Sequence, residues 1–187
     1  MTKELTLVGI AGSLRKRSLS KALLRAMGEL APEGLTIVSA DIGALPHYDQ
    51  DLDEDGVRPE SVEAFKKAIG DADGVLIVTP EYNHSVPGVL KNAIDWASRP
   101  GFRAPFTDKP VAFAGISPGA HGAARAQLHL ENILLGMLSA IFPHRGVAVG
   151  GAPGKFDDDL RLSDQGTRDF VADFLTQYRD WLCSREG

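Results

Sequence analysis

The chain has 187 residues, 43% of them hydrophobic and 24% charged, which is typical of one globular domain with a sizeable core. Its formal net charge of −5 argues against nucleic acid as the main partner, and so does the lack of any dense run of lysine or arginine. No apolar stretch approaches the roughly 18–20 residues that cross a bilayer, and the single cysteine excludes an internal disulfide and a cysteine-based metal cluster.

Apolar, strand-like runs alternate five times with helical patterns along the chain. Strands are predicted at Leu5–Ile10, Leu35–Ala40, Gly74–Thr79, Pro110–Ile116 and Gly146–Val149. Helices are predicted at Ser18–Leu30, Pro59–Ile69, Pro87–Ser98, His121–Ala140 and Ser163–Leu182. The first, third and fourth strands are nearly continuous in apolar residues, which indicates that helices cover both faces of the sheet. The alternation therefore predicts a doubly wound α/β fold with a parallel sheet, in a single domain over residues 1–187.

Local signals support this interpretation at both ends of the chain. The run from Leu5 is too short for a signal peptide and lacks a small-residue cleavage site, so we interpret it as a first strand and expect a cytoplasmic protein. Ser18 precedes the first helix, and Pro59 and Pro87 stand in the first turns of the next two. Cys183 lies in the last turns of the C-terminal helical pattern, where we expect a packing residue rather than a nucleophile.

Two irregular segments, Ile42–Arg58 and Gly150–Leu162, lie inside the alternation. Both are too short for interdomain linkers. Long loops within a compact domain are commonly binding or interface loops, whereas the acidic residues of these two are typical of solvated surface.

The first strand ends in a turn with the chemistry of an anion site. Gly12 allows a tight turn, and the hydroxyls of Ser13, Ser18 and Ser20 follow it. Backbone N–H groups and the positive dipole end at a helix N-terminus attract anions, and Arg15 can pair with phosphate oxygens through two N–H groups. Neither the dinucleotide nor the Walker pattern is present, and this set satisfies one terminal phosphate monoester. Alternatively, Ser18 or Ser20 is only a helix cap and the arginine is surface charge.

The third strand ends in a turn, residues 80–88, that is rich in hydrogen-bonding groups. Tyr82 can lie along a flat heteroaromatic ring, and Asn83 with neighbouring amides can hydrogen-bond the edge of such a ring. His84 is a candidate general base, but no serine or cysteine nucleophile pattern accompanies it, so an ordinary loop histidine is favoured. Glu81 is either catalytic or, as we expect, fixes the backbone of the loop.

Residues 117–122 form a third turn, after the fourth strand. Gly119 and Gly122 either let the backbone approach a ligand closely or serve only to connect strand and helix. Because ligands bind at the carboxyl ends of parallel strands, the three turns together indicate a flat, phosphorylated ligand. His121 and His129 are eight residues apart with no third ligand at a zinc-like spacing, so we predict no metal site.

These turns carry a resemblance to a known family. The segments GSLRKRSLSKALL, TPEYNHSVPGVLKNAIDW and SPGAHGAARAQLHLENIL resemble the NAD(P)H-dependent FMN reductases, which include bacterial quinone, chromate and azo-dye reductases. The similarity runs over almost the whole chain, down to GAPGKFDDDLRLSDQGTRDF. It implies a flavodoxin-like, five-stranded parallel sheet in the order 2-1-3-4-5, with FMN across the carboxyl ends of the strands.

The resemblance also implies which residues bind FMN. On the family pattern, Ser13, Arg15, Ser18 and Ser20 hold the phosphate; Pro80, Glu81, Tyr82 and Asn83 line the isoalloxazine; Ser117, Pro118 and Gly119 close its other side. The chain departs from the pattern at Ser20, where relatives usually have asparagine. A hydroxyl can still donate a hydrogen bond there.

The implied reaction has two steps. NADPH or NADH delivers hydride to FMN, and an oxidised small-molecule acceptor such as a quinone, a free flavin or an azo compound then takes the electrons. Because the cofactor carries the chemistry, no catalytic side chain is expected. One alternative is a flavodoxin-type electron carrier without direct NAD(P)H reactivity. Such carriers tend to be much more acidic and have a phosphate loop rich in threonine and serine, whereas Arg15 occupies that loop here. Another alternative is a flavin-free regulatory or scaffolding domain.

The resemblance further implies a homodimer or homotetramer with FMN near the interface. The helix Pro87–Trp96 would contribute to that interface, so Trp96 is either an interface residue or a core residue.

Overall fold

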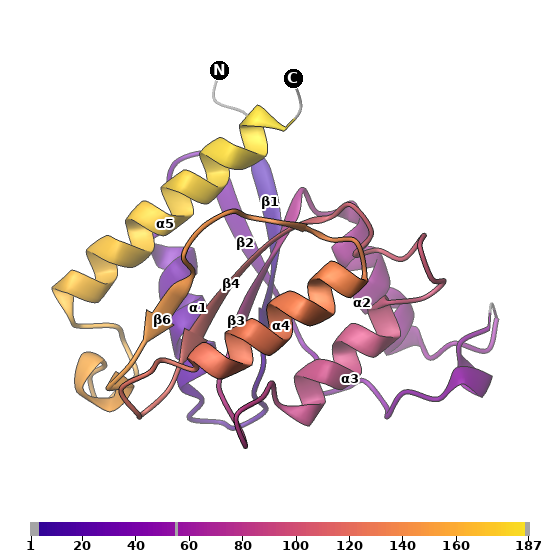
Figure 1. Cartoon of the computed structure of the whole chain (residues 1–187), viewed down its shortest axis with the longest axis horizontal. Coiled ribbons are helices and arrows are strands. Elements are labelled where there is room, and N and C mark those ends of the chain that lie inside the picture. The colour runs from indigo at the N-terminus through magenta and orange to yellow at the C-terminus, as the bar shows by residue number, and fades with distance from the viewer. Residues whose placement is uncertain (1–3, 55, 186–187) are drawn as a thin grey trace.

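The structure, a computed structural model, describes residues 4–54 and 56–185 and is an α/β fold (Figure 1). Asp55, in the first of the two irregular segments, lies outside the described residues, as do both ends of the predicted domain. The strands are β1 Leu5–Ala11, β2 Leu35–Ala40, β3 Gly74–Thr79, β4 Pro110–Ile116, β5 Ala140–Ile141 and β6 Val147–Val149. The helices are α1 Leu19–Glu29, α2 Glu60–Asp71, α3 Gly88–Ala97, α4 Ala124–Gly136 and α5 Gln165–Ser184, with short 3-10 turns at Gln50–Leu52 and Ala152–Lys155.

The sheet has the predicted order. Its strands run β2-β1-β3-β4-β5, every pairing is parallel, and β6 also pairs with β4. The register pairs Leu7 with Gly74 and Val75 with Val111, so the central strands are aligned along most of their length. The prediction of a flavodoxin-like, doubly wound sheet is confirmed.

The fifth position of the sheet differs from the prediction. It is occupied by two short segments, because β5 pairs with Pro110 and Val111 while β6 pairs with Ala114 to Ile116. Pro143 and Gly146 lie between them, and proline cannot donate a ladder hydrogen bond. Ala140, the last residue of the predicted helix, is in strand β5 instead, and so is Ile141.

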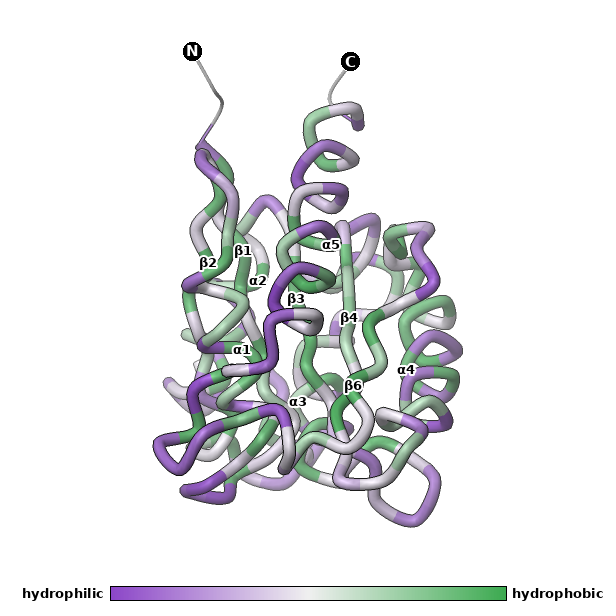
Figure 2. The backbone as a smooth tube through the Cα atoms, turned by 90° about the vertical axis from the view of Figure 1, so that its left-hand side faces the viewer, coloured by the Kyte–Doolittle hydropathy of each residue, from purple (hydrophilic) through white to green (hydrophobic). Residues whose placement is uncertain are grey.

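Helices cover both faces of the sheet, as the continuous apolar strands predict. Met27 of α1 and Phe174 of α5 belong to one buried cluster. Ile69 of α2, Ile94 of α3 and Leu130 of α4 belong to a second cluster on the other face. Hydrophobic residues run along the central strands between these layers (Figure 2). The two layers hold the carboxyl ends of β1, β3 and β4 in place.

Helix boundaries follow from local capping. Ser18 is the N-cap of α1 and its side chain accepts the N–H of Lys21, and Asp164 caps α5 by accepting from Thr167. Helix α4 begins three residues later than predicted, because Gly122 and Ala123 have φ angles of +56° and +62°. It ends four residues earlier, before Leu138 with a φ of +60°.

Two side chains answer open expectations. Trp96 is completely buried within the chain, and its Nε1–H donates to the carbonyl of Pro46 at 2.8 Å, which makes it a core residue of this fold. Cys183 is exposed, so the prediction of a packing residue is wrong. The C-terminal helix buries the face that includes Leu182 and turns the adjacent cysteine outward. Within residues 4–54 and 56–185, no helix combines the length and apolar character needed to cross a membrane.

Candidate functional site

Three parallel strands end in turns that meet at one edge of the sheet, the lower edge in Figure 1. The turns are residues 12–18 after β1, 80–87 after β3 and 117–123 after β4. Together they line a cavity of about 110 Å³, formed by Ser13, Arg15, Ser18, Leu19, Ser20, Pro80, Glu81, Tyr82, Ile116, Ser117 and Pro118. Nine of the eleven predicted cofactor-binding residues lie in this lining, and only Asn83 and Gly119 do not.

The first turn presents buried hydroxyls to the cavity. The exposed fractions of Ser13, Ser18 and Ser20 are 5%, 3% and 1%. Ser18 Oγ lies 2.8 Å from Ser20 Oγ and also accepts the N–H of Lys21 at 3.2 Å. Ser18 is thus both a helix cap and a lining residue, so these two interpretations of the motif are compatible.

Arg15 is the cation of this cavity. It is exposed, and its guanidinium makes no hydrogen bond or ion pair within the part of the chain that the structure describes. Arg17, two residues later, instead donates from Nη2 to the carbonyl of Asp158 at 2.9 Å. An anion at the N-terminus of α1 would therefore have the Arg15 guanidinium beside it.

The second turn is a tight two-residue reversal. Tyr82 and Ser85 exchange backbone hydrogen bonds of 3.1 and 3.0 Å, and the intervening Asn83 and His84 have φ angles of +50° and +65°. Positive φ at both central positions is the type I′ pattern, in which asparagine is favoured. The turn leaves Tyr82 48% exposed at the rim of the cavity, whereas Asn83 lies outside the lining.

The third turn is held against β6. Ser117 donates its N–H to the carbonyl of Val149 at 3.1 Å, and Gly151 donates to the carbonyl of Gly119 at 3.0 Å. A Cβ atom on Gly122 would lie 2.5 Å from the carbonyl carbon of Ala148, so only glycine fits between the turn and the strand. This packing fixes the third turn and accounts for its glycine.

Glu81 connects the second turn to α4. Its Oε2 accepts the N–H groups of Arg125 and Ala126 at 3.0 and 3.2 Å, and its Oε1 lies 3.5 Å from Nδ1 of His84. Partial burial opposes ionisation of the carboxyl group, but the N–H of Ala126, the His84 ring and the N–H of Arg125 outweigh it and lower the pKa of Glu81. The sequence predicts that Glu81 fixes its own loop, whereas in the structure it binds the backbone of a helix.

Other cavities are larger, including two of about 320 and 300 Å³ that lie by the end of α3 and beside β6. One of about 920 Å³ lies between the segments 48–58 and 99–105, and one of about 530 Å³ lies between α1 and β2 and shares Ser13 with the first site. None of these cavities collects residues from all three turns. We favour the smaller cavity because it lies at the carboxyl ends of the central strands, where the strand order reverses, and combines hydroxyls, a cation and an aromatic ring.

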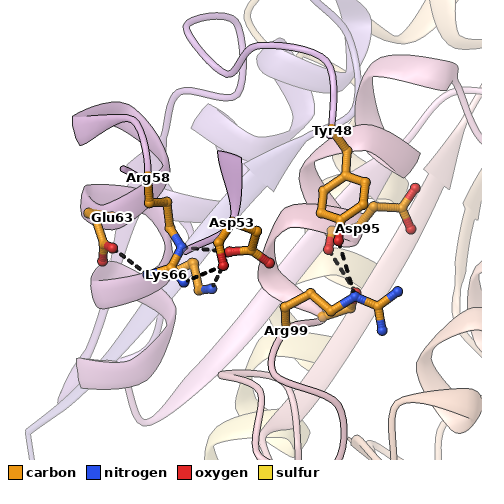
Figure 3. A network of polar contacts seen from close by, with 8 residues as sticks. Tyr48, Asp53, Arg58, Glu63, Lys66, Asp95 and Arg99 are labelled. Carbon is orange, nitrogen blue, oxygen red and sulfur yellow. Dashed lines mark hydrogen bonds and ion pairs between the residues drawn. The ribbon is translucent and has the colours of Figure 1, made fainter. Parts of the chain in front are cut away.

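The cavity of about 920 Å³ contains a network of ion pairs (Figure 3). Asp53, whose side chain is 5% exposed, lies between Arg58 Nε at 2.6 Å and Lys66 Nζ at 3.4 Å. The hydrogen bond that Arg58 donates to Asp53 raises the pKa of Arg58. Separately, Arg99 Nε donates to the hydroxyl of Tyr48 at 3.3 Å. These contacts anchor the irregular segment after β2 to α2 and to the end of α3.

Sequence reasoning missed three residues around the site. Leu19 and Ile116 line the cavity but look like ordinary core residues in the sequence. Arg125 donates from Nη1 to Nδ1 of His84 at 2.5 Å and offers its backbone N–H to Glu81. A cation in the first turn of a helix is unfavourable for the helix dipole, and this feature of Arg125 is the sequence signal that marks it as unusual.

Comparisons with known proteins agree with this geometry. Residues 5–154 match the family model described as NADPH-dependent FMN reductase. The chain is 42% identical over 176 residues to a 2-hydroxy-1,4-benzoquinone reductase from Burkholderia sp, which covers 94% of this chain and 95% of that protein. It is 41% identical over 187 residues to an NAD(P)H-dependent FMN reductase from Pseudomonas aeruginosa, covering 100% of both chains. Among solved structures, the flavoenzyme NAD(P)H:(acceptor) oxidoreductase FerB from Paracoccus denitrificans matches with a TM-score of 0.87 and 39% identity, over 96% of this chain and 98% of that one.

Proposed function

The chain belongs to the NADPH-dependent FMN reductase family, and from this we propose an FMN-dependent enzyme that oxidises NAD(P)H and reduces small-molecule acceptors. Quinones are the first acceptors to consider, because a relative that is 42% identical is named as a benzoquinone reductase. Free flavins and azo compounds are further acceptors. The observation that carries the proposal is the convergence of three strand-end turns on one cavity.

The phosphate of FMN fits the first turn. A buried hydroxyl requires hydrogen-bond partners, yet among residues 4–54 and 56–185 Ser13 Oγ has only the N–H of Arg15, at 3.4 Å. We propose that Ser13, Ser18 and Ser20 donate to the phosphate and that Arg15 neutralises it, at the positive end of the α1 dipole.

The flavin ring fits the second and third turns. A cavity of about 110 Å³ is smaller than the roughly 300–1,000 Å³ of pockets that enclose a whole ligand, so it can receive only one end of FMN. We propose that Pro80, Tyr82 and the Asn83 amide contact the ring at the open rim, and that residues 117–119 close its other side. An open rim leaves room for nucleotide and acceptor to reach the ring in turn.

FMN, when bound, supplies the redox chemistry, because it accepts hydride from NAD(P)H and passes two electrons to an oxidised acceptor. The side chains have simpler roles. Arg15 and the three serines bind and orient the phosphate end, Tyr82 orients the ring, and Ser117 with Pro118 restricts water on one side. No residue of the site needs to donate or accept a proton for the hydride step.

Further aspects of the family pattern remain proposals for this chain. We propose that residues 1–187 act as one FMN-binding domain and that the protein works in the cytoplasm, where reduced pyridine nucleotide is supplied. We also propose a homodimer or homotetramer. Leu128 and Leu135 support self-association, because they are 65% and 56% exposed and lie two turns apart on α4.

Steady-state oxidation of NADPH and NADH with 1,4-benzoquinone as acceptor tests the proposed function. We expect turnover that requires FMN and is lost when the protein is stripped of it. Quinone-dependent turnover equal in the presence and absence of FMN would contradict a flavin mechanism. Sedimentation velocity of the same sample tests the proposed oligomeric state. A sedimentation coefficient of a monomer at micromolar concentration would contradict that proposal.

A further inference from the structure

Helix α4 begins without a cap of its own. Its N-cap residue is Ala123, which has a left-handed backbone conformation and a side chain that cannot accept a hydrogen bond. The first turn of α4 also contains no acidic residue that could accept one. The first N–H groups of a helix lack intrahelical partners, so a helix of 13 residues normally has such an acceptor close by in sequence.

The acceptor comes from a turn more than forty residues earlier. Glu81 Oε2 lies 3.0 Å from the N–H nitrogen of Arg125 and 3.2 Å from that of Ala126, and its side chain is 20% exposed. We propose that Glu81 is a positioning residue, which caps α4 from the β3 turn and thereby holds the second and third turns of the cavity in their relative places. This inference rests on the proposed function for the identity of the ligand but not for the cap itself.

The packing explains why this contact matters for the site. The third turn is fixed to β6 through the Ser117–Val149 hydrogen bond and the close approach at Gly122. The second turn projects from β3 with two successive residues in the left-handed region, which is a conformation that needs support from its surroundings. Glu81 immediately precedes Tyr82, so a carboxylate anchored on α4 limits where the Tyr82 ring can lie. Arg125 adds a second contact between the same elements through His84.

A residue that acts by position has a distinct mutational signature. In Glu81→Ala both N–H groups lose their acceptor, and we expect the Kd for FMN to rise about five- to tenfold, the range of a lost helix cap. In Glu81→Gln the amide oxygen can still accept a hydrogen bond, so we expect FMN affinity within about twofold of the wild type. Glu131→Ala, which removes a carboxylate from the middle of α4, is the matched control and should leave the affinity unchanged.

The cap can be measured without the cofactor. Hydrogen exchange of the flavin-free full-length chain should show faster exchange of the Arg125 and Ala126 amides in Glu81→Ala, by about five- to tenfold, and near wild-type exchange in Glu81→Gln. The amides of Tyr82 and Ser85, each of which donates to the carbonyl of the other residue, should also exchange faster in the alanine variant.

Two results would overturn the inference. One is unchanged exchange at Arg125 and Ala126 in Glu81→Ala. The other is a loss of FMN affinity in Glu81→Gln as large as in the alanine variant while both amides stay protected, because Glu81 would then act on the ligand itself. If the wild-type chain bound no FMN, the proposed function would fail, and exchange in the flavin-free chain would still decide the cap. If the alanine variant did not fold, Glu81→Gln would decide the proposal: near wild-type affinity and exchange would support it, and a loss of FMN affinity greater than that of Glu131→Ala while the Arg125 and Ala126 amides stay protected would overturn it.

Discussion

Replacing Arg15 by alanine should weaken FMN binding without weakening the fold. The side chain is exposed and has no hydrogen bond or ion pair within the described residues, so its removal breaks no contact of the folded chain. Hydrogen bonds to a charged group contribute roughly 1.5–3 kcal/mol, which corresponds to a rise of about 10- to 150-fold in the Kd for FMN. Tyr82→Ala removes an aromatic contact of roughly 0.5–1.5 kcal/mol, or about 2- to 12-fold, and so should have the smaller effect.

Fluorescence titration of flavin-free protein with FMN measures these affinities, and thermal unfolding of the same samples checks the fold. Arg17→Ala is the matched control. It removes the same charge two residues away, from a side chain that bonds to the Asp158 carbonyl and does not line the cavity. The difference between Arg15→Ala and Arg17→Ala should shrink at high salt, because an exposed charge pair is screened.

The phosphate assignment would be refuted by equal FMN affinity in Arg15→Ala and the wild type. It would be refuted equally by identical losses in Arg15→Ala and Arg17→Ala, since the effect would then reflect net charge alone.

Three further predictions concern stability. Because the folded-state pKa of Glu81 lies below its ordinary value of 4.5, its ionised form stabilises the fold above that pH. The wild type should therefore have a higher Tm than Glu81→Gln at pH 7, and this advantage should disappear as the pH falls through the lowered pKa. A Tm difference that does not change with pH would contradict the assignment. Gly122→Ala should lower the free energy of unfolding by at least about 2 kcal/mol in urea titrations, because Gly122 has a positive φ and an added Cβ would clash with β6. Gly136→Ala, which has open space around its Cβ position, should instead raise the free energy of unfolding by about 0.4–1 kcal/mol. Equal effects of the two substitutions would refute this reasoning. Trp96→Phe removes the 2.8 Å hydrogen bond to the Pro46 carbonyl and should lower the free energy of unfolding by roughly 1–3 kcal/mol in urea titrations. An unchanged free energy of unfolding would show that this bond does not anchor the segment Ile42–Arg58.

The sequence predicts the central sheet well because burial on both faces leaves a strong signal. All six residues of β3 are buried, and the run of apolar residues that fills it is visible without any structure. The turns that follow β1, β3 and β4 are equally visible, because polar and glycine residues interrupt apolar runs abruptly. Parallel alignment then brings these turns together, which is why most of the predicted site residues meet at one cavity.

Features that depend on contacts far apart in sequence were not predictable in this way. The pattern of residues 121–140 is helical throughout, although residues with positive φ shorten α4 at both ends. At the N-terminal end, Gly122 packs tightly against β6, which the sequence does not indicate. The fifth position of the sheet is divided in the same unpredicted way, since β5 and β6 pair with different parts of β4. Likewise, nothing near Glu81 in the sequence indicates that its partners are the amides of Arg125 and Ala126.

The visible absorption spectrum of the FMN-loaded protein under anaerobic conditions tests the proposed reaction itself. We predict flavin bands that bleach when NADPH or NADH is added and return when a quinone follows. Bound flavin that stays oxidised with both nucleotides would instead identify an electron carrier that needs a separate donor, and failure to retain any flavin would contradict the assignment of the cavity.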